Sequence, residues 1–249
     1  MSLPLRALFS RRASEPAVIT VEFDRDIFLV QFRRNAQARR YTLRIQSATR
    51  EVILTLPPRG SLKQAREFAH RQAAWIAARL KRLPQPVHFA DGSVLPLRGV
   101  DHTIVHCPGA RGTVWVEPGN RLCVAGDEHH LARRVRDYLK KEAKRDLELA
   151  SKSAASALGA VLKRVSIRDQ SSRWGSCSTT GVLSYSWRLI LTPPFVLDYL
   201  AAHEAAHLIE MNHSRAFWRQ VARVCPDFKR AKAWLDAHGA DLHRYGMGD

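Results

Sequence analysis

The segment FVLDYLAAHEAAHL, residues 195–208, carries ionisable side chains on a stretch that otherwise suits a buried helix. Its apolar residues cover two neighbouring stripes of a helical surface, formed by Val196 and Leu200 and by Leu197, Ala201 and Leu208. A buried polar side chain without a partner costs roughly 2–7 kcal/mol. His203, Glu204 and His207 must therefore have a partner or a function inside the fold.

The spacing of these three residues favours metal binding. His203 and His207 are four positions apart, so on a helix they project from nearly the same angle, one turn apart, and two imidazoles can meet one ion. Glu204 is displaced around the helix and can reach a water on that ion without ligating it. This is the HExxH arrangement, which is more informative than a single buried histidine bonded to backbone.

His213 is the expected third ligand. Six residues after His207, a continuous helix would place it about 240° away, so the helix is expected to end near Met211 and Asn212. Asn212 suits such an ending, because asparagine adopts the left-handed conformation more readily than most residues. Three neutral histidines and a water form an open tetrahedral Zn²⁺ site, and an open position indicates catalysis.

The motifs RWGSCS, SWRLIL.PP.VLDY, HE..H and EMNHS..FW follow one another over residues 173–218. In these motifs the chain resembles the YgjP-like family of zincin metallopeptidase relatives, which is similar to the SprT and WLM-type proteases, over about residues 30–245. The resemblance implies an α+β zincin-like domain, zinc held by His203, His207 and His213, and Glu204 as the catalytic base. Ala205 and Ala206 depart from the larger residue that relatives commonly carry, but both suit a helix.

The remaining patterns predict an α+β chain with an HExxH helix against an antiparallel sheet, preceded by a β-rich half. β-Branched and aromatic alternation predicts antiparallel strands before Pro57, and an amphipathic helix follows from Ser61 to Leu83. Dense charge with apolar periodicity predicts a helix from Asp127 to about Leu158, and strand patterns follow until Pro193. We expect a flexible tail at 1–15, a β-rich region with one helix at 16–126 and a catalytic region at 127–249, with one integrated family domain over about residues 30–245.

The segment SSRWGSCS predicts substrate contacts at Trp174, Gly175 and Ser176. A glycine in an edge strand allows another backbone to approach closely, which suits an extended peptide bound beside the metal. The same glycine could instead accommodate a bulky core residue such as Trp187. The other large aromatic residues of the C-terminal half are expected to pack in the core.

Charge and composition add expectations about location and partners. Residues 1–90 contain 17 Lys and Arg against six Asp and Glu, part of a net charge of +17. This excess favours a polyanion such as nucleic acid or a nucleotide, although it also fits a solvated basic face. The longest apolar runs fall short of the roughly 20 residues of a membrane helix, and the four cysteines form no CxxC pair, so we expect a cytoplasmic protein without membrane contact.

Three functions are compatible with these features. The first is a zinc-dependent hydrolase of peptide or protein substrates, in which Glu204 takes a proton from the attacking water. The second is a metal-dependent hydrolase of nucleotide phosphoanhydrides, although no P-loop or acidic magnesium cluster is evident. The third is a nucleic-acid-associated protease of SprT type, delivered by the basic residues 1–90, although no DNA-binding motif is recognisable.

Overall fold

The computed structural model describes residues 18–46, 49–170 and 173–247 and divides the chain into two compact units, 1–83 and 84–249. The tail predicted for residues 1–15 lies outside the described residues. The predicted α+β class is confirmed, because both units contain runs of strands followed by runs of helices. The division at residue 83 differs from the one expected at residue 126, because the strands of residues 94–125 belong to the second unit. Within the described part of the chain, no helix is long and apolar enough to span a bilayer.

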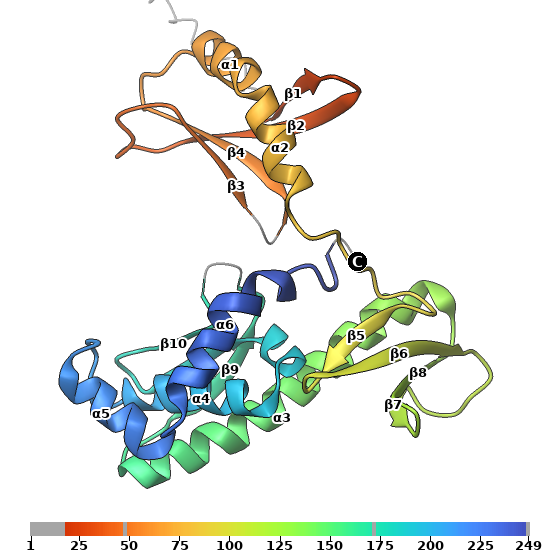
Figure 1. Cartoon of the computed structure of the whole chain (residues 1–249), viewed down its shortest axis with the longest axis vertical. Coiled ribbons are helices and arrows are strands. Elements are labelled where there is room, and N and C mark those ends of the chain that lie inside the picture. The colour runs from red at the N-terminus through yellow and green to blue at the C-terminus, as the bar shows by residue number, and fades with distance from the viewer. Residues whose placement is uncertain (1–17, 47–48, 171–172, 248–249) are drawn as a thin grey trace, which may run out of the picture. The chain divides into compact units, whose positions relative to one another are not determined.

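The described part of the first unit is a four-stranded sheet with two short helices (Figure 1). Its elements are β1 (Val18–Phe23), β2 (Asp26–Arg34), β3 (Thr42–Gln46), β4 (Glu51–Leu56), α1 (Leu62–Arg71) and α2 (Ala73–Lys81). The strand order is β1-β2-β4-β3, and β2 pairs with β4 in parallel, so the sheet is mixed and the prediction of purely antiparallel strands was wrong. The one helix expected here is interrupted at Gln72.

Alternation along the strands buries one face of this sheet against the helices. Alternate residues of β4 are buried, and they share one hydrophobic cluster with Ala65 and Ala69 of α1 and Ile76 of α2. This two-layer arrangement follows from the period of two in a strand and 3.6 in a helix.

The second unit contains a four-stranded sheet, a three-stranded sheet and four α-helices. The first sheet comprises β5 (Val94–Leu97), β6 (Val100–Cys107), β7 (Val114–Glu117) and β8 (Arg121–Ala125), in the order β5-β6-β8-β7. Its strand order and its central parallel pair match those of the first unit's sheet. The long helix α3 (Leu131–Leu158) follows, as the charge and apolar periodicity predicted, and ends at Gly159 in a left-handed conformation.

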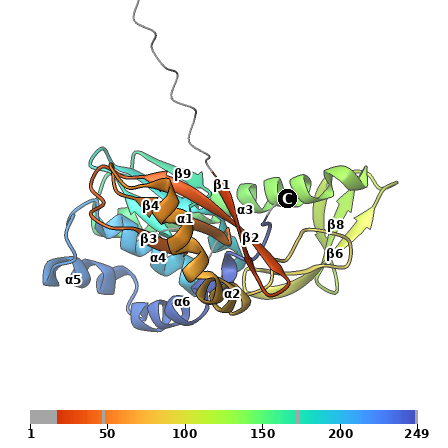
Figure 2. The ribbon, with the colours of Figure 1, turned by 90° about the horizontal axis from the view of Figure 1, so that it is seen from above.

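The part of this unit that holds the HExxH residues packs on α3. It contains β9 (Arg164–Arg168), β10 (Gly175–Cys177), β11 (Val182–Ser186), α4 (Pro194–Ala206), α5 (Arg215–Val224) and α6 (Phe228–Leu242). The helix α4 contacts α3, α5 and α6 as well as β10. Within this unit, α3 extends from the sheet of β5–β8 toward α5 (Figures 1 and 2).

The three-stranded sheet has the order β10-β11-β9, with β10 at an edge. Because β9 and β11 are parallel while β10 and β11 are antiparallel, the sheet beside α4 is mixed, and its prediction as antiparallel was wrong. The strand expected to continue to Leu191 ends at Ser186, whose hydroxyl accepts from the amide of Arg188 and begins a 3₁₀ helix, Trp187–Leu191.

Candidate metal site

The helix α4 carries His203 and Glu204 in its last turn. Pro194 occupies the first turn, where its missing amide hydrogen leaves no hydrogen bond unmade. Most of the helix is buried, and Glu204 is only 4% exposed. The packing of α3, α5 and α6 around α4 therefore fixes the backbone from which both side chains extend.

The three histidines meet at the end of α4. Each offers one ring nitrogen, and these nitrogens all lie within 4.8 Å of one another. The Nε2 atoms of His203 and His213 are 3.1 Å apart. Two neutral imidazoles can hold this separation if one donates a hydrogen to the other, or if both lone pairs face a cation. The geometry therefore provides a cluster of nitrogen donors pointing at one place.

A short turn brings His213 back to the helix. The helix ends at Ala206, five residues before the expected Met211, and His207 is its C-cap. The amide of Glu210 donates to the carbonyl of Ala206 at 2.9 Å, which closes the turn. Asn212 is not among the described non-glycine residues with positive φ, so the expectation of a left-handed asparagine was wrong.

The same turn orients His207. Its Nδ1 lies 2.9 Å from the carbonyl oxygen of Glu210 and can donate a hydrogen to it. That bond fixes the tautomer in which Nε2 keeps its lone pair, as an outer-shell carbonyl does for histidine ligands of metals. Sequence reasoning did not identify this role of Glu210, because it depends on where the helix ends.

The first turn of α5 packs two aromatic side chains, Phe217 and Trp218, against the histidines. Phe217 is fully buried, and its ring centroid lies 4.5–4.9 Å from those of His203, His207 and His213. The ring centroid of Trp218 lies 5.8 Å from that of His203 and 6.0 Å from that of His213. Ser214 begins the helix by accepting from the amide of Phe217. The spacing of Phe217 and Trp218 after His213 was the available signal, but the expectation assigned them only to the core.

Burial favours the neutral forms of His203, His207 and Glu204. It lowers the pKa of His203 to about 4, assisted by the charges of His207 and His213, and it also lowers the pKa of His207. Burial raises the pKa of Glu204 to about 8, and the charge of Arg173 partly opposes this. Neutral imidazoles keep the lone pairs that a metal ion needs.

Glu204 lies directly against Gly175 of the edge strand β10. A Cβ added at Gly175 would lie 2.8 Å from both Cγ and Cδ of Glu204 and closer still to Oε1. Gly175 therefore accommodates the carboxylate, whereas the alternative expectation was that it accommodates Trp187. The tertiary structure thus brings Gly175, an expected substrate contact on β10, against Glu204, the expected base on α4.

We expect Gly175→Ala to disturb the position of Glu204. The added methyl group overpacks the contact, which typically costs about 1–3 kcal/mol of stability, and a carboxylate displaced by about 1 Å can lower turnover on the order of 10²-fold. Thermal unfolding and peptide hydrolysis measure the two effects. Gly109→Ala is the matched control, because a Cβ there meets no atom within 4 Å. Wild-type stability and turnover in the Gly175 variant would contradict the contact.

The other two expected substrate contacts lie differently. Trp174 stacks on His243 with ring centroids 5.0 Å apart. Ser176 pairs with Ser184 in the sheet, and strand alternation places its side chain on the face opposite to the one Gly175 turns toward Glu204. Gly175, in contrast, lies directly against Glu204.

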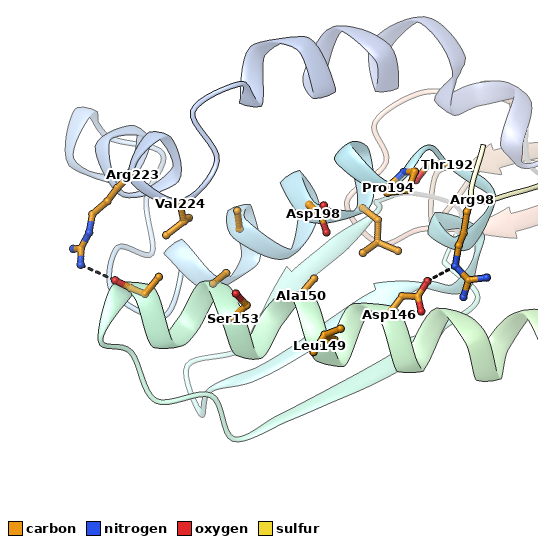
Figure 3. Close-up of a pocket in the computed structure, with 14 residues that line it drawn as sticks. Arg98, Asp146, Leu149, Ala150, Ser153, Thr192, Pro194, Asp198, Arg223 and Val224 are labelled. Atoms are coloured by element: carbon orange, nitrogen blue, oxygen red, sulfur yellow. Dashed lines mark hydrogen bonds and ion pairs between the residues drawn. The ribbon is translucent and has the colours of Figure 1, made fainter. Parts of the chain in front are cut away.

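A cavity of about 650 Å³ lies on the other side of α4 (Figure 3). Asp198 and Ala202 line it, and on a helix Asp198 lies about 140° around the axis from His203 and about 180° from His207. Arg98, which is paired with Asp146 at 2.7 Å, and Arg223, which donates to the carbonyl of Ala157 at 2.6 Å, also line it. The histidine cluster and Glu204 do not line this cavity, so it does not give access to the site.

Comparison with known proteins identifies the family. No curated protein sequence matches the chain. Among solved structures, the crystal structure of the metallopeptidase zymogen of Pyrococcus abyssi abylysin matches with 28% sequence identity. The match covers 40% of this chain and 97% of that chain. Its TM-score of 0.35 is too low to bear on the fold or the site. The family model of the YgjP-like metallopeptidase domain matches residues 39–238, which span the histidines, Glu204 and Gly175. The chain therefore belongs to the YgjP-like metallopeptidase family, as its motifs predicted.

Proposed function

We propose that the chain is a zinc-dependent peptidase in which His203, His207 and His213 hold the metal and Glu204 is the general base. The observation that carries this proposal is the convergence of three imidazole nitrogens within 4.8 Å of one another beside a carboxylate that is 4% exposed. The family supports a metal-dependent peptidase, and the identity of the metal and the residue roles are our inference.

The donor set fits zinc. Two nitrogens bound to a tetrahedral zinc at 2.0–2.1 Å lie about 3.3 Å apart. The 3.1 Å between Nε2 of His203 and Nε2 of His213 is close to that spacing. A zinc ion held there would supply Lewis acidity, which makes water a nucleophile near neutral pH and polarises the substrate carbonyl.

Beside a bound cation the pKa of Glu204 would fall from the value of about 8 that burial gives it, so that its carboxylate could move the proton. A carboxylate beside the reacting water takes its proton during attack and delivers it to the departing amine. Because Gly175 has no side chain, it leaves room for the side chain of Glu204. The packing of α4 limits the movement of the Glu204 backbone. These residues thus support a general base held in place before substrate arrives.

The edge strand β10 offers a place for an extended peptide. The amide of Ser186 donates to the carbonyl of Trp174, and the amide of Ser178 donates to the carbonyl of Val182. Hydrogen-bonded and non-bonded residues alternate in an antiparallel pair, so the backbone groups of Gly175 and Cys177 point away from β11 toward the open edge. A substrate that adds to this edge as a further strand would pass Glu204 at Gly175.

Nucleotide phosphoanhydride hydrolysis is the second candidate and stays a prediction. Within the described residues, the histidine cluster is the group of three or more side chains placed to hold an ion. Nitrogen donors suit zinc, whereas the magnesium of phosphoryl-transfer sites prefers carboxylate oxygens. Phosphate release from nucleoside triphosphates by the purified protein would favour this alternative.

A polyanion contact through the basic residues 1–90 also stays a prediction. In the described part of the first unit, Arg71 at the end of α1, Trp75 and Arg79 on α2 and Arg82 at its C-cap have exposed side chains, and Trp75 is 44% exposed. Arginines around an aromatic ring suit phosphates and a stacked base. Salt-dependent retention on DNA would separate a nucleic-acid-associated protease from a simple peptidase.

The proposed function predicts one zinc per chain and hydrolysis of peptide bonds. Elemental analysis of protein expressed in zinc-replete medium measures the first, and mass spectrometry of an unbiased peptide library measures the second. Removal of the metal with a chelator should abolish cleavage, and added zinc should restore it. A protein that holds zinc but cleaves no peptide in the library would contradict the peptidase assignment.

A further inference from the structure

A cavity of about 750 Å³ lies beside the proposed metal site. It is formed by three segments that are far apart in the sequence, residues 159–163 after α3, the β10–β11 turn at 178–181 and residues 207–211 after α4. His207 itself lines the cavity. A group bound in the cavity would therefore lie next to a substrate carbonyl held at the histidines.

The cavity is lined by apolar side chains that face solvent. Val161 is 86% exposed, Met211 is 50% exposed and Ile209 is 43% exposed. Exposed apolar side chains that gather at a hollow next to a reactive site are typical of a ligand-binding surface, whereas single ones are ordinary. These three come from two of the segments, so the fold assembles them into one surface.

The hydroxyls of Ser178 and Thr180 in the β10–β11 turn are engaged within the turn. The hydroxyls of Ser178 and Thr180 lie 2.9 Å apart, and Ser178 Oγ also accepts from the amide of Val182 at 3.0 Å. The amide of Gly181 donates to the carbonyl of Ser178. The hydroxyls of Ser178 and Thr180 are therefore less available to a polar ligand, which favours an apolar one.

The cavity also continues the path of the proposed substrate. The strand β10 leads from Gly175, beside Glu204, to Ser178, which lines the cavity. A peptide lying along the edge would place a side chain near the scissile bond against the cavity. Lys163 is another lining residue, and its positive charge disfavours a basic side chain there.

We propose that this cavity is the specificity subsite of the enzyme and takes a large apolar side chain of the peptide substrate adjacent to the scissile bond. This inference rests on the proposed peptidase function. Val161, Ile209 and Met211 determine the preference, through burial of apolar area, and Lys163 excludes basic residues.

Binding of amino acid hydroxamates to the zinc-loaded protein tests the subsite without relying on turnover. Leucine hydroxamate and glycine hydroxamate share the metal-binding group and differ in the side chain, so the ratio of their Kd values, measured by isothermal titration calorimetry, reports on the cavity. We expect leucine hydroxamate to bind about 10-fold more tightly or better, as burial of a leucine side chain provides.

The variants Val161→Asp and Met211→Gln should reduce this ratio to below about threefold, since they place polar groups on the apolar lining. Val116→Asp is the matched control, because Val116 is 44% exposed on β7 and outside the cavity. An unchanged ratio in both cavity variants, with wild-type zinc content, would overturn the subsite and leave the peptidase function standing. Failure of the wild-type protein to bind either hydroxamate would overturn both.

Self-association is the competing explanation for the exposed apolar surface. Sedimentation of the wild-type protein and Val161→Asp distinguishes it from a substrate subsite. A dimer that the substitution dissociates, together with an unchanged hydroxamate ratio, would assign the surface to a second copy of the chain and overturn the proposal.

Discussion

The Glu204→Gln variant is expected to keep its zinc and lose hydrolysis by about 10²–10⁴-fold, the usual contribution of general-base catalysis. Glutamine has the shape of glutamate and still forms hydrogen bonds, but it does not accept a proton at neutral pH. The substitution occurs beside Gly175, where the space is tight, and it preserves the volume that this contact requires. Folding should therefore survive, because no cavity or clash is created.

One purified preparation provides both measurements for this variant, elemental analysis for zinc and the cleavage rate on a peptide identified with the wild-type protein. Glu148→Gln is the matched control, since Glu148 pairs with Lys144 at 3.8 Å on α3 and is not a member of the site. Loss of zinc would show that Glu204 ligates or supports the metal. Retention of zinc and full turnover would rule out its role as the base.

The His213→Ala variant should lose zinc affinity while the fold remains intact. His213 is exposed and lies outside the helices, so its removal deletes little buried area, and surface substitutions usually change stability by about 0.5 kcal/mol or less. Loss of a group that only supports a metal ligand already lowers affinity by about 10–100-fold, and loss of a ligand should lower it at least as much. Hydrolysis should fall with zinc occupancy.

Competition with a zinc-binding dye gives the affinity of this variant, and thermal unfolding of the metal-free protein gives its stability. His238→Ala is the control, because His238 is also exposed but lies against Trp234 of α6, with ring centroids 4.8 Å apart. Unchanged zinc affinity in the His213 variant would remove His213 from the site. A large loss of stability without metal would instead make it a structural residue.

The sequence indicated the histidine cluster because its signals are local. His203 and His207 are related by one helical turn, and that relation depends only on the helix period. The apolar stripes of α4 predicted its burial, and the charge and apolar periodicity predicted α3. His213 was found from its proximity in the sequence, although the route of the turn was not, because the bond between His207 and the carbonyl of Glu210 depends on the early end of the helix.

Relations between distant segments were beyond the sequence. Parallel pairing of β9 with β11 and of β2 with β4, and the end of the first unit at residue 83, depend on which strands meet after the chain folds. Strand propensity reports only that a strand forms, because pairing energies come from neighbours that are remote in the sequence.

The sequence by itself determined that His203 and His207 share one face of a buried helix with Glu204 beside them, since helical spacing is a property of the local chain. Only the tertiary structure decided what surrounds them. It places Gly175 against Glu204, the ring of Phe217 against the histidines and Val161 beside Met211. The physical reason is that close packing acts between side chains brought together by the fold, and its consequences depend on distances that no single segment contains.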